Sequence, residues 1–93
     1  MALLNDAEVE AQLAALPGWE RRGGAIEKSF ERGDFAGSVR FVDALAAPAE
    51  EMNHHPDLAI SWDTVTVTIT THSEGGLTAD DFELAGKIDA LAE

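Results

Sequence analysis

Histidine is the residue type in this 93-residue chain best suited to chemistry near neutral pH, and its three copies lie in two short segments. His54 and His55 are adjacent and precede Pro56, whereas His72 follows a run rich in threonine. An imidazole has an unperturbed pKa of about 6.5, so it can both donate and accept protons near pH 7. Three converging imidazoles would therefore form either a general acid–base site or a metal site.

The adjacent pair is poorly spaced for a metal. Side chains at positions i and i+1 diverge by about 100° on a helix and point to opposite faces of a strand. Metal-binding histidines usually return both rings to one side, as at positions i and i+4 of a helix. Pro56 favours an extended backbone at His55, which suits two imidazoles that touch different parts of one flat substrate. We therefore expect acid–base chemistry with no metal, and a small metalloprotein is the less favoured alternative.

Charge and composition exclude several classes of protein. The chain has 18 acidic and 6 basic residues, which gives a formal net charge of −12. Phosphate groups are bound by clustered lysine and arginine, so we expect no direct nucleic-acid partner and no attachment to anionic membranes. Cysteine is absent, which excludes disulfides and thiol catalysis. Residues 1–6 lack the basic and apolar regions of a signal peptide, and no segment has the ~20 apolar residues of a membrane span. We therefore expect a cytoplasmic protein.

The apolar pattern predicts the elements that must position the histidines. We expect one domain over residues 1–93, with the order helix, two strands, helix, two strands, helix. The capping residues expected to begin the helices are Asn5, Asp34 and Thr78. The expected strands cover 19–22, 25–31, 57–63 and 64–71. This order is typical of an α+β fold in which a four-stranded antiparallel sheet has helices packed on one face.

The second expected helix has a broad apolar pattern. Its main stripe is expected to consist of Phe35, Val39, Val42 and Ala46. Phe41 and Leu45 widen the stripe, so we expect this helix to touch more than one surface. Pro48 falls inside the pattern, and we expect a kinked but continuous helix there in preference to a new helix that begins at Pro48.

The last two expected strands lead to the third histidine. The third strand has an alternating apolar set that consists of Leu58, Ile60 and Trp62. In the fourth strand, valine or isoleucine at positions 65, 67 and 69 alternates with threonine at positions 66, 68 and 70. Successive side chains of a strand point to opposite faces, so continued alternation places His72 on the threonine face, away from the core.

Two segments of the chain together carry a family signature. Residues 50–56 read E-x-x-x-H-H-P, and residues 71–81 read T-H-x-x-G-G-L-T-x-x-D. The pair Gly18-Trp19 precedes the first expected strand. With the order of helices and strands, these features resemble the pterin-4a-carbinolamine dehydratases, also called 4a-hydroxytetrahydrobiopterin dehydratases, across nearly the whole chain.

The resemblance implies a hydro-lyase activity. Such an enzyme removes water from 4a-hydroxytetrahydropterin, the product that aromatic amino-acid hydroxylases leave, and yields quinonoid dihydropterin for recycling to tetrahydropterin. The resemblance also implies a small-molecule pterin substrate, no metal, no organic cofactor, and a homodimer or homotetramer. The alternative that it leaves open is a non-catalytic member that acts as a dimerisation cofactor or as an assembly factor for another protein.

The resemblance implies a set of site residues as well. The catalytic residues are His54, His55 and His72, with Glu50 and Asp81 as supporting acids. The substrate-binding residues are Trp19, Asn53, His54, His55, Pro56, Thr70, Thr71 and His72. An acid must protonate the 4a-hydroxyl group and a base must remove the N5 proton, and each positioned transfer is worth about 10²–10⁴-fold in rate. We expect His54 and His72 to handle these protons and His55 to assist and orient.

Simpler structural roles are open for several of these residues. Asp81 lies three positions after Thr78, so it could complete a capping box as well as support a histidine. Trp19 could be a core or pocket-wall residue, and Glu50 could be an exposed helix residue. His72 could be a solvent-facing residue at the end of a strand.

Overall fold

The computed structural model describes residues 2–93, and Met1 lies outside the described residues. Within that range the chain forms three α-helices, four β-strands and one short 3₁₀ turn, in the predicted order α-β-β-α-β-β-α. The elements are α1 (Asp6–Ala14), β1 (Glu20–Arg22), β2 (Ala25–Glu31), α2 (Phe35–Met52), β3 (Asp57–Ser61), β4 (Thr64–Ile69), η1 (His72–Glu74) and α3 (Ala79–Ala92). The predicted α+β class is therefore confirmed.

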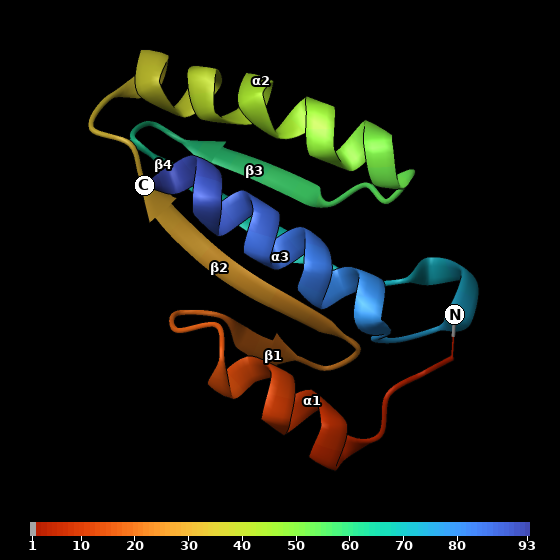
Figure 1. Cartoon of the computed structure of the whole chain (residues 1–93). Coiled ribbons are helices and arrows are strands. Elements are labelled where there is room, and N and C mark those ends of the chain that lie inside the picture. Colours follow the sequence, from red (N-terminus) through yellow and green to blue (C-terminus); the bar gives the residue numbers. More distant parts are fainter. Residues whose placement is uncertain (1) are drawn as a thin grey trace.

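The strands form one antiparallel sheet in the order β1-β2-β4-β3. The long strands β2 and β4 pair in its centre, where Ile26 lies opposite Ile69 and Phe30 lies opposite Val65. Figure 1 shows the helices on one face of this sheet, with α3 across its middle, α2 on the β3 side and α1 beside β1. The predicted antiparallel sheet with helices on one face is confirmed.

Strand β4 supplies much of the core, as its alternating pattern predicted. Val65, Val67 and Ile69 are fully buried beneath the helices, whereas the intervening threonines face the other way and are half-buried. Leu84 and Ile88 of α3 are also fully buried and belong to the same hydrophobic cluster. Each such side chain contributes about 1.5–3 kcal/mol to folding by leaving water. This packing fixes α3 over the centre of the sheet and so fixes the position of its first turn.

Helix α2 buries a different stripe from the predicted one. Its buried residues are Ser38, Phe41, Leu45 and Ala49. Phe35, which we placed in the main stripe, is 58% exposed, so that part of the prediction was wrong. Ser38 is polar, so the apolar pattern gave no sign that it belongs to the buried face of the helix. Its hydroxyl can be buried because it donates to the backbone carbonyl of Trp62 (2.8 Å). The helix is continuous through Pro48, as predicted, and the kink stays a prediction.

Strand β3 ends at Ser61, two residues earlier than predicted. Ser61 pairs with Thr64, so Trp62 and Asp63 form the two-residue loop of a β-hairpin. Such loops need a residue with positive φ, and Trp62 adopts φ +52° with its side chain 69% exposed. The alternating pattern placed Trp62 in the strand, and this prediction was wrong. The hairpin loop needs a residue with positive φ at this position, and that need outweighs the hydrophobicity of the side chain.

Candidate active site

The two adjacent histidines follow a sharp stop at the C-terminal end of α2. Asn53 adopts the left-handed conformation (φ +50°), which asparagine tolerates better than most residues. Its backbone N–H donates to the carbonyl of Glu50 (3.1 Å), and the N–H of His54 donates to the carbonyl of Ala49 (3.0 Å). This is the Schellman pattern, which satisfies the last carbonyls of a helix and turns the chain away from its axis. His54 and His55 therefore lie between the end of α2 and the start of β3.

The two imidazoles point to different partners, as expected for neighbouring positions. His54 is largely buried, with 12% of its side chain exposed, and its Nε2 lies 2.6 Å from Oδ1 of Asp81 in α3. His55 is 56% exposed, and its Nε2 lies 2.5 Å from Oε2 of Glu50 in the last turn of α2. Each histidine is thus paired with one of the two predicted supporting acids. The pairs come from different elements and differ sharply in exposure to solvent.

Asp81 performs two roles at once. Its side chain is fully buried, and its Oδ2 accepts hydrogen bonds from the backbone N–H of Thr78 and from the hydroxyl of Thr71, both at 2.8 Å. The first of these bonds completes the capping box at the start of α3, while Oδ1 faces His54. The N-terminal end of a helix also favours a negative charge. Asp81 therefore caps α3 and contacts His54 at the same time, and its part as a supporting acid in catalysis stays a prediction.

The third histidine, His72, follows Thr71 in the segment after β4. The hydroxyl of Thr71 donates to Asp81, the partner of His54. Regular pairing ends at Ile69, so the prediction of a strand up to Thr71 was wrong. Thr71 forms only an isolated bridge with Gly76, and His72 then begins the turn η1 and is exposed. The chain leaves the sheet here because Gly75, in a left-handed conformation (φ +76°), closes a tight loop in which three backbone N–H groups donate to the carbonyl of Thr71.

The remaining residues of the predicted site lie close to these segments, with one exception. Pro56 and His55 line a groove of about 320 Å³ between α2 and β3, beside Glu50. Asn53 forms the exposed helix stop, and Thr70 donates its hydroxyl to the carbonyl of Gly24 (2.5 Å). Contact of these residues with a substrate stays a prediction.

Trp19 is the exception, because the structure does not bring it to the histidines. Its indole N–H donates to both oxygens of Asp89, each at 3.1 Å. Asp89 follows Asp81 by eight positions on α3, which corresponds to about 12 Å along the helix axis. Trp19 is buried and packs edge-on against Phe30. A wall or core role fits this position, and its part in substrate binding stays a prediction.

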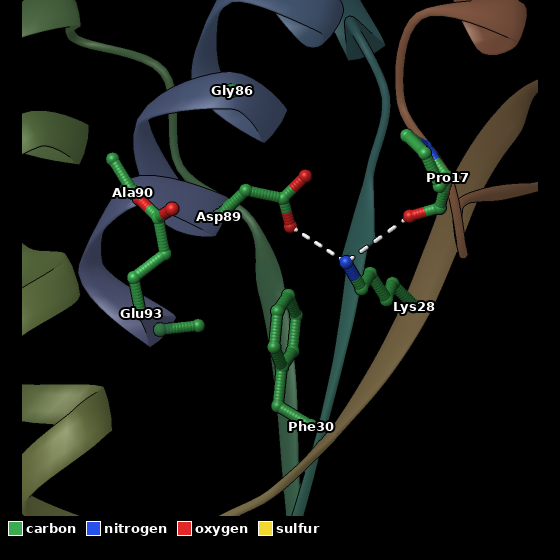
Figure 2. A pocket seen from close by; sticks show the side chains of 8 residues that line it. Pro17, Lys28, Phe30, Gly86, Asp89, Ala90 and Glu93 are labelled. Carbon is green, nitrogen blue, oxygen red and sulfur yellow. Dashed lines mark hydrogen bonds and ion pairs between the residues drawn. The ribbon is translucent and has the colours of Figure 1, made fainter.

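A charged pair that the sequence analysis missed holds the Trp19 region together. Lys28 donates to Oδ1 of Asp89 (2.8 Å) and to the carbonyl of Pro17 (3.2 Å), as Figure 2 shows. The pair borders a hollow of about 470 Å³ beside Gly86. The sequence does contain a sign of this pair: Lys28 lies between Ile26 and Phe30 in the row of β2 side chains that faces the core.

Two absences concern the part of the chain that the structure describes. Across residues 2–93, no group of three or more His, Asp or Glu side chains is arranged to hold a metal ion. None of the helices in this range is long and apolar enough to cross a membrane.

The site contains two carboxylate–histidine pairs at one end of α2, His54–Asp81 and His55–Glu50. A carboxylate that accepts a bond from one ring nitrogen leaves the other nitrogen for proton exchange.

Comparison with known proteins assigns the sequence to a family. The family model described as "Pterin 4 alpha carbinolamine dehydratase" matches residues 2–91. The chain belongs to this family. A relative from Thermosynechococcus vestitus, provisionally named a pterin-4-alpha-carbinolamine dehydratase, is 53% identical over 96% of this chain and 94% of its own length. A relative from Mycobacterium tuberculosis with the same provisional name is 44% identical over 98% of this chain and 97% of its own.

Solved structures of family relatives have the same fold. A Brucella melitensis protein described as a transcriptional coactivator/pterin dehydratase superimposes with a TM-score of 0.92 at 37% identity, covering 97% of this chain and 98% of that one. A pterin dehydratase-like protein described as a RuBisCO assembly factor in the alpha-carboxysome superimposes with a TM-score of 0.65 at 29% identity. That match covers 80% of this chain and 86% of the other, so the family fold includes a protein described by an assembly role.

Proposed function

We propose that this chain catalyses the dehydration of a 4a-hydroxytetrahydropterin to quinonoid dihydropterin. The observation that carries the proposal is the presence of two carboxylate–histidine pairs, His54–Asp81 and His55–Glu50, at one end of α2. Membership of the pterin carbinolamine dehydratase family supports it. The substrate of such an enzyme is a small pterin, and the reaction serves tetrahydropterin recycling after aromatic amino-acid hydroxylation.

The proposed reaction moves one proton in and one proton out. An imidazolium donates its proton to the 4a-hydroxyl oxygen, the C4a–O bond breaks, and water leaves. A neutral imidazole removes the proton from N5, and the electron pair forms the C4a=N5 double bond. We assign these transfers to His54 and His72, with His55 assisting and orienting the substrate. Each transfer by a positioned group is worth about 10²–10⁴-fold.

Binding of the substrate is assigned to the two segments that flank the histidines. These are residues 53–56 and residues 70–72, and one residue of each segment contacts Asp81: His54 faces its Oδ1, and Thr71 donates to its Oδ2. The pterin head is uncharged, so hydrogen bonds can hold it without arginine or lysine. We propose that residues 1–93 act as a single domain without metal or cofactor, as a cytoplasmic homodimer or homotetramer.

A direct assay tests the proposal. Stopped-flow absorbance measures the dehydration of 4a-hydroxytetrahydropterin against the spontaneous reaction, with the folded state checked by circular dichroism. We expect a clear acceleration that falls at least about 10²-fold in His54→Ala. A folded protein that does not accelerate the reaction would overturn the proposal. A His72→Ala variant with the full rate would overturn the assignment of His72 alone.

One observation supports a second candidate function. The solved pterin dehydratase-like protein described as a RuBisCO assembly factor superimposes over 80% of this chain. The alternative for this chain is therefore a non-catalytic binding role, as a dimerisation cofactor or an assembly factor for another protein. Such a role does not require both carboxylate–histidine pairs, and their joint presence favours catalysis. Failure of the assay above in folded protein would favour the alternative.

A further inference from the structure

Hydrogen bonds connect four side chains in an unbroken line that ends at His54. The hydroxyls of Thr78 and Thr71 lie 2.9 Å apart, and the Thr71 hydroxyl donates to Oδ2 of Asp81 at 2.8 Å. Oδ1 of the same carboxylate lies 2.6 Å from Nε2 of His54. Thr71, Thr78 and Asp81 are all buried, so water does not compete for these bonds.

The direction of each bond follows from the number of protons available. A hydroxyl has one proton, and Thr71 uses its proton on Asp81, so Thr78 must donate to Thr71. The oxygen of Thr78 in turn accepts from the backbone N–H of Asp80 (3.3 Å). A carboxylate only accepts, so the Nε2 of His54 is the donor to Asp81. Every proton along the line therefore points toward the carboxylate.

Thr71 has no polar group left for a substrate. Its backbone N–H donates to the carbonyl of Gly76 (3.0 Å), and its own carbonyl accepts from the N–H groups of Glu74 and Gly75, each at 3.0 Å. Its hydroxyl is bonded on both sides within the line described above. The substrate-binding role that the family resemblance implies for Thr71 is thus poorly matched to its contacts.

We propose that Thr71 and Thr78 are positioning residues that act on His54 through Asp81. By orienting the carboxylate they hold a proton on Nε2 of His54, so that Nδ1 is the ring nitrogen that exchanges protons with the substrate. This inference rests on the proposed dehydratase function for its consequence in catalysis. The location of the proton itself does not depend on that function.

Nuclear magnetic resonance of the unmodified protein tests the proton location without any substrate. In a sample with ¹⁵N-labelled histidine at a pH where the ring is neutral, we expect Nε2 of His54 to give the shift of a protonated ring nitrogen. Its bonded proton should resonate downfield and exchange slowly with water, because the bond to Asp81 is buried. A spectrum in which Nε2 has no proton would overturn the inference, whatever the enzyme activity.

Variants of Thr71 test the positioning role. Thr71→Val removes the hydroxyl at nearly constant volume, and we expect faster exchange of the His54 Nε2 proton and a kcat lower by about 10-fold, with KM little changed. Thr71→Ser keeps the hydroxyl and should restore both readouts. Thr66→Val is the matched control, because it removes a threonine hydroxyl bonded to Ser29 (2.9 Å) in β4, away from Asp81.

The outcomes separate this inference from the proposed function. A rise in KM at constant kcat in Thr71→Val would show that Thr71 contacts the substrate and would overturn the positioning role. Unchanged kcat and unchanged proton exchange would also overturn it. If the unmodified protein shows no dehydratase activity, the proposed function fails, and the resonance of His54 still decides where the proton lies.

If Thr71→Val does not fold, the comparison of Thr71→Ser with the unmodified protein supplies the same readouts. Loss of the Nε2 proton in the serine variant would contradict the inference.

Discussion

The carboxylate of Asp81 lies 2.6 Å from the imidazole of His54 while it completes the N-terminal cap of its own helix. Its Oδ1 contacts the histidine, and its Oδ2 accepts hydrogen bonds from the backbone N–H of Thr78 and the hydroxyl of Thr71. The side chain that completes the capping box of α3 is therefore also the one that contacts a proposed proton carrier. Substitutions at this position should change stability and activity together, whereas substitutions in the exposed pair should not.

Asp81→Asn should reduce both activity and stability. An amide has no negative charge to face His54, so we expect kcat to fall by about 10²-fold. Loss of the cap should lower the free energy of unfolding by about 1–2 kcal/mol. Stopped-flow assays and urea denaturation measure the two effects. Asp80→Asn, one position earlier in the same turn, is the control and should retain kcat; a full rate in Asp81→Asn would show that the carboxylate is not needed.

Glu50→Gln should have a small effect on stability. The Glu50–His55 pair is exposed, and exposed ion pairs contribute about 0–1 kcal/mol because water and salt screen them. We expect a smaller loss of kcat than in Asp81→Asn, since His55 is assigned an assisting role. Glu51→Gln in the same turn is the matched control. A rate loss in Glu50→Gln as large as that in Asp81→Asn would reverse the proposed order of importance of the two histidines.

Lys28→Met should weaken the fold without touching the chemistry. The substitution leaves the half-buried carboxylate of Asp89 with the indole of Trp19 but without its cationic partner. Removing one partner of such a pair costs about 1–3 kcal/mol, which urea denaturation can measure. Lys87→Met, which removes an exposed pair with Glu83, should cost much less. Full stability in Lys28→Met would mean that the pair does not hold the α3 end in place.

Self-association should strengthen as salt is added. The net charge of −12 per chain makes identical copies repel one another. Raising the ionic strength from 0.01 M to 0.15 M shortens the Debye length from about 30 Å to about 8 Å and weakens that repulsion. Sedimentation velocity at both salt concentrations measures the association constant. An assembly that dissociates on addition of salt would indicate that ion pairs between copies dominate.

Much of the fold was predictable because local signals agreed with the final packing. The caps at Asn5 and Thr78 and the alternation in β4 each depend on neighbours within a few positions, and each was confirmed. The buried face of α2 was not predictable from apolar residues alone, because Ser38 in the core row is polar and Phe35 outside it is aromatic. Burial there is decided by the sheet beneath the helix.

The candidate site was predictable only in part for a related reason. The family signature singled out both acids, but the pairing of His54 with Asp81 joins residues 27 positions apart. The contact between Lys28 and Asp89 spans 61 positions and had no signature at all. Such contacts depend on how α3 crosses the sheet, and no local pattern encodes that placement.

Asp81 and Thr78 take part both in the cap of α3 and in the support of His54, and this has a consequence for how the proposed activity would be lost. Helix ends open locally far more often than whole domains unfold. Because the first turn of α3 is also the support of His54, each opening of that turn removes the proposed proton carrier from its working position. Catalytic rate would then report on the fraying of a single helical turn, and inactivation on heating would precede the melting of the sheet.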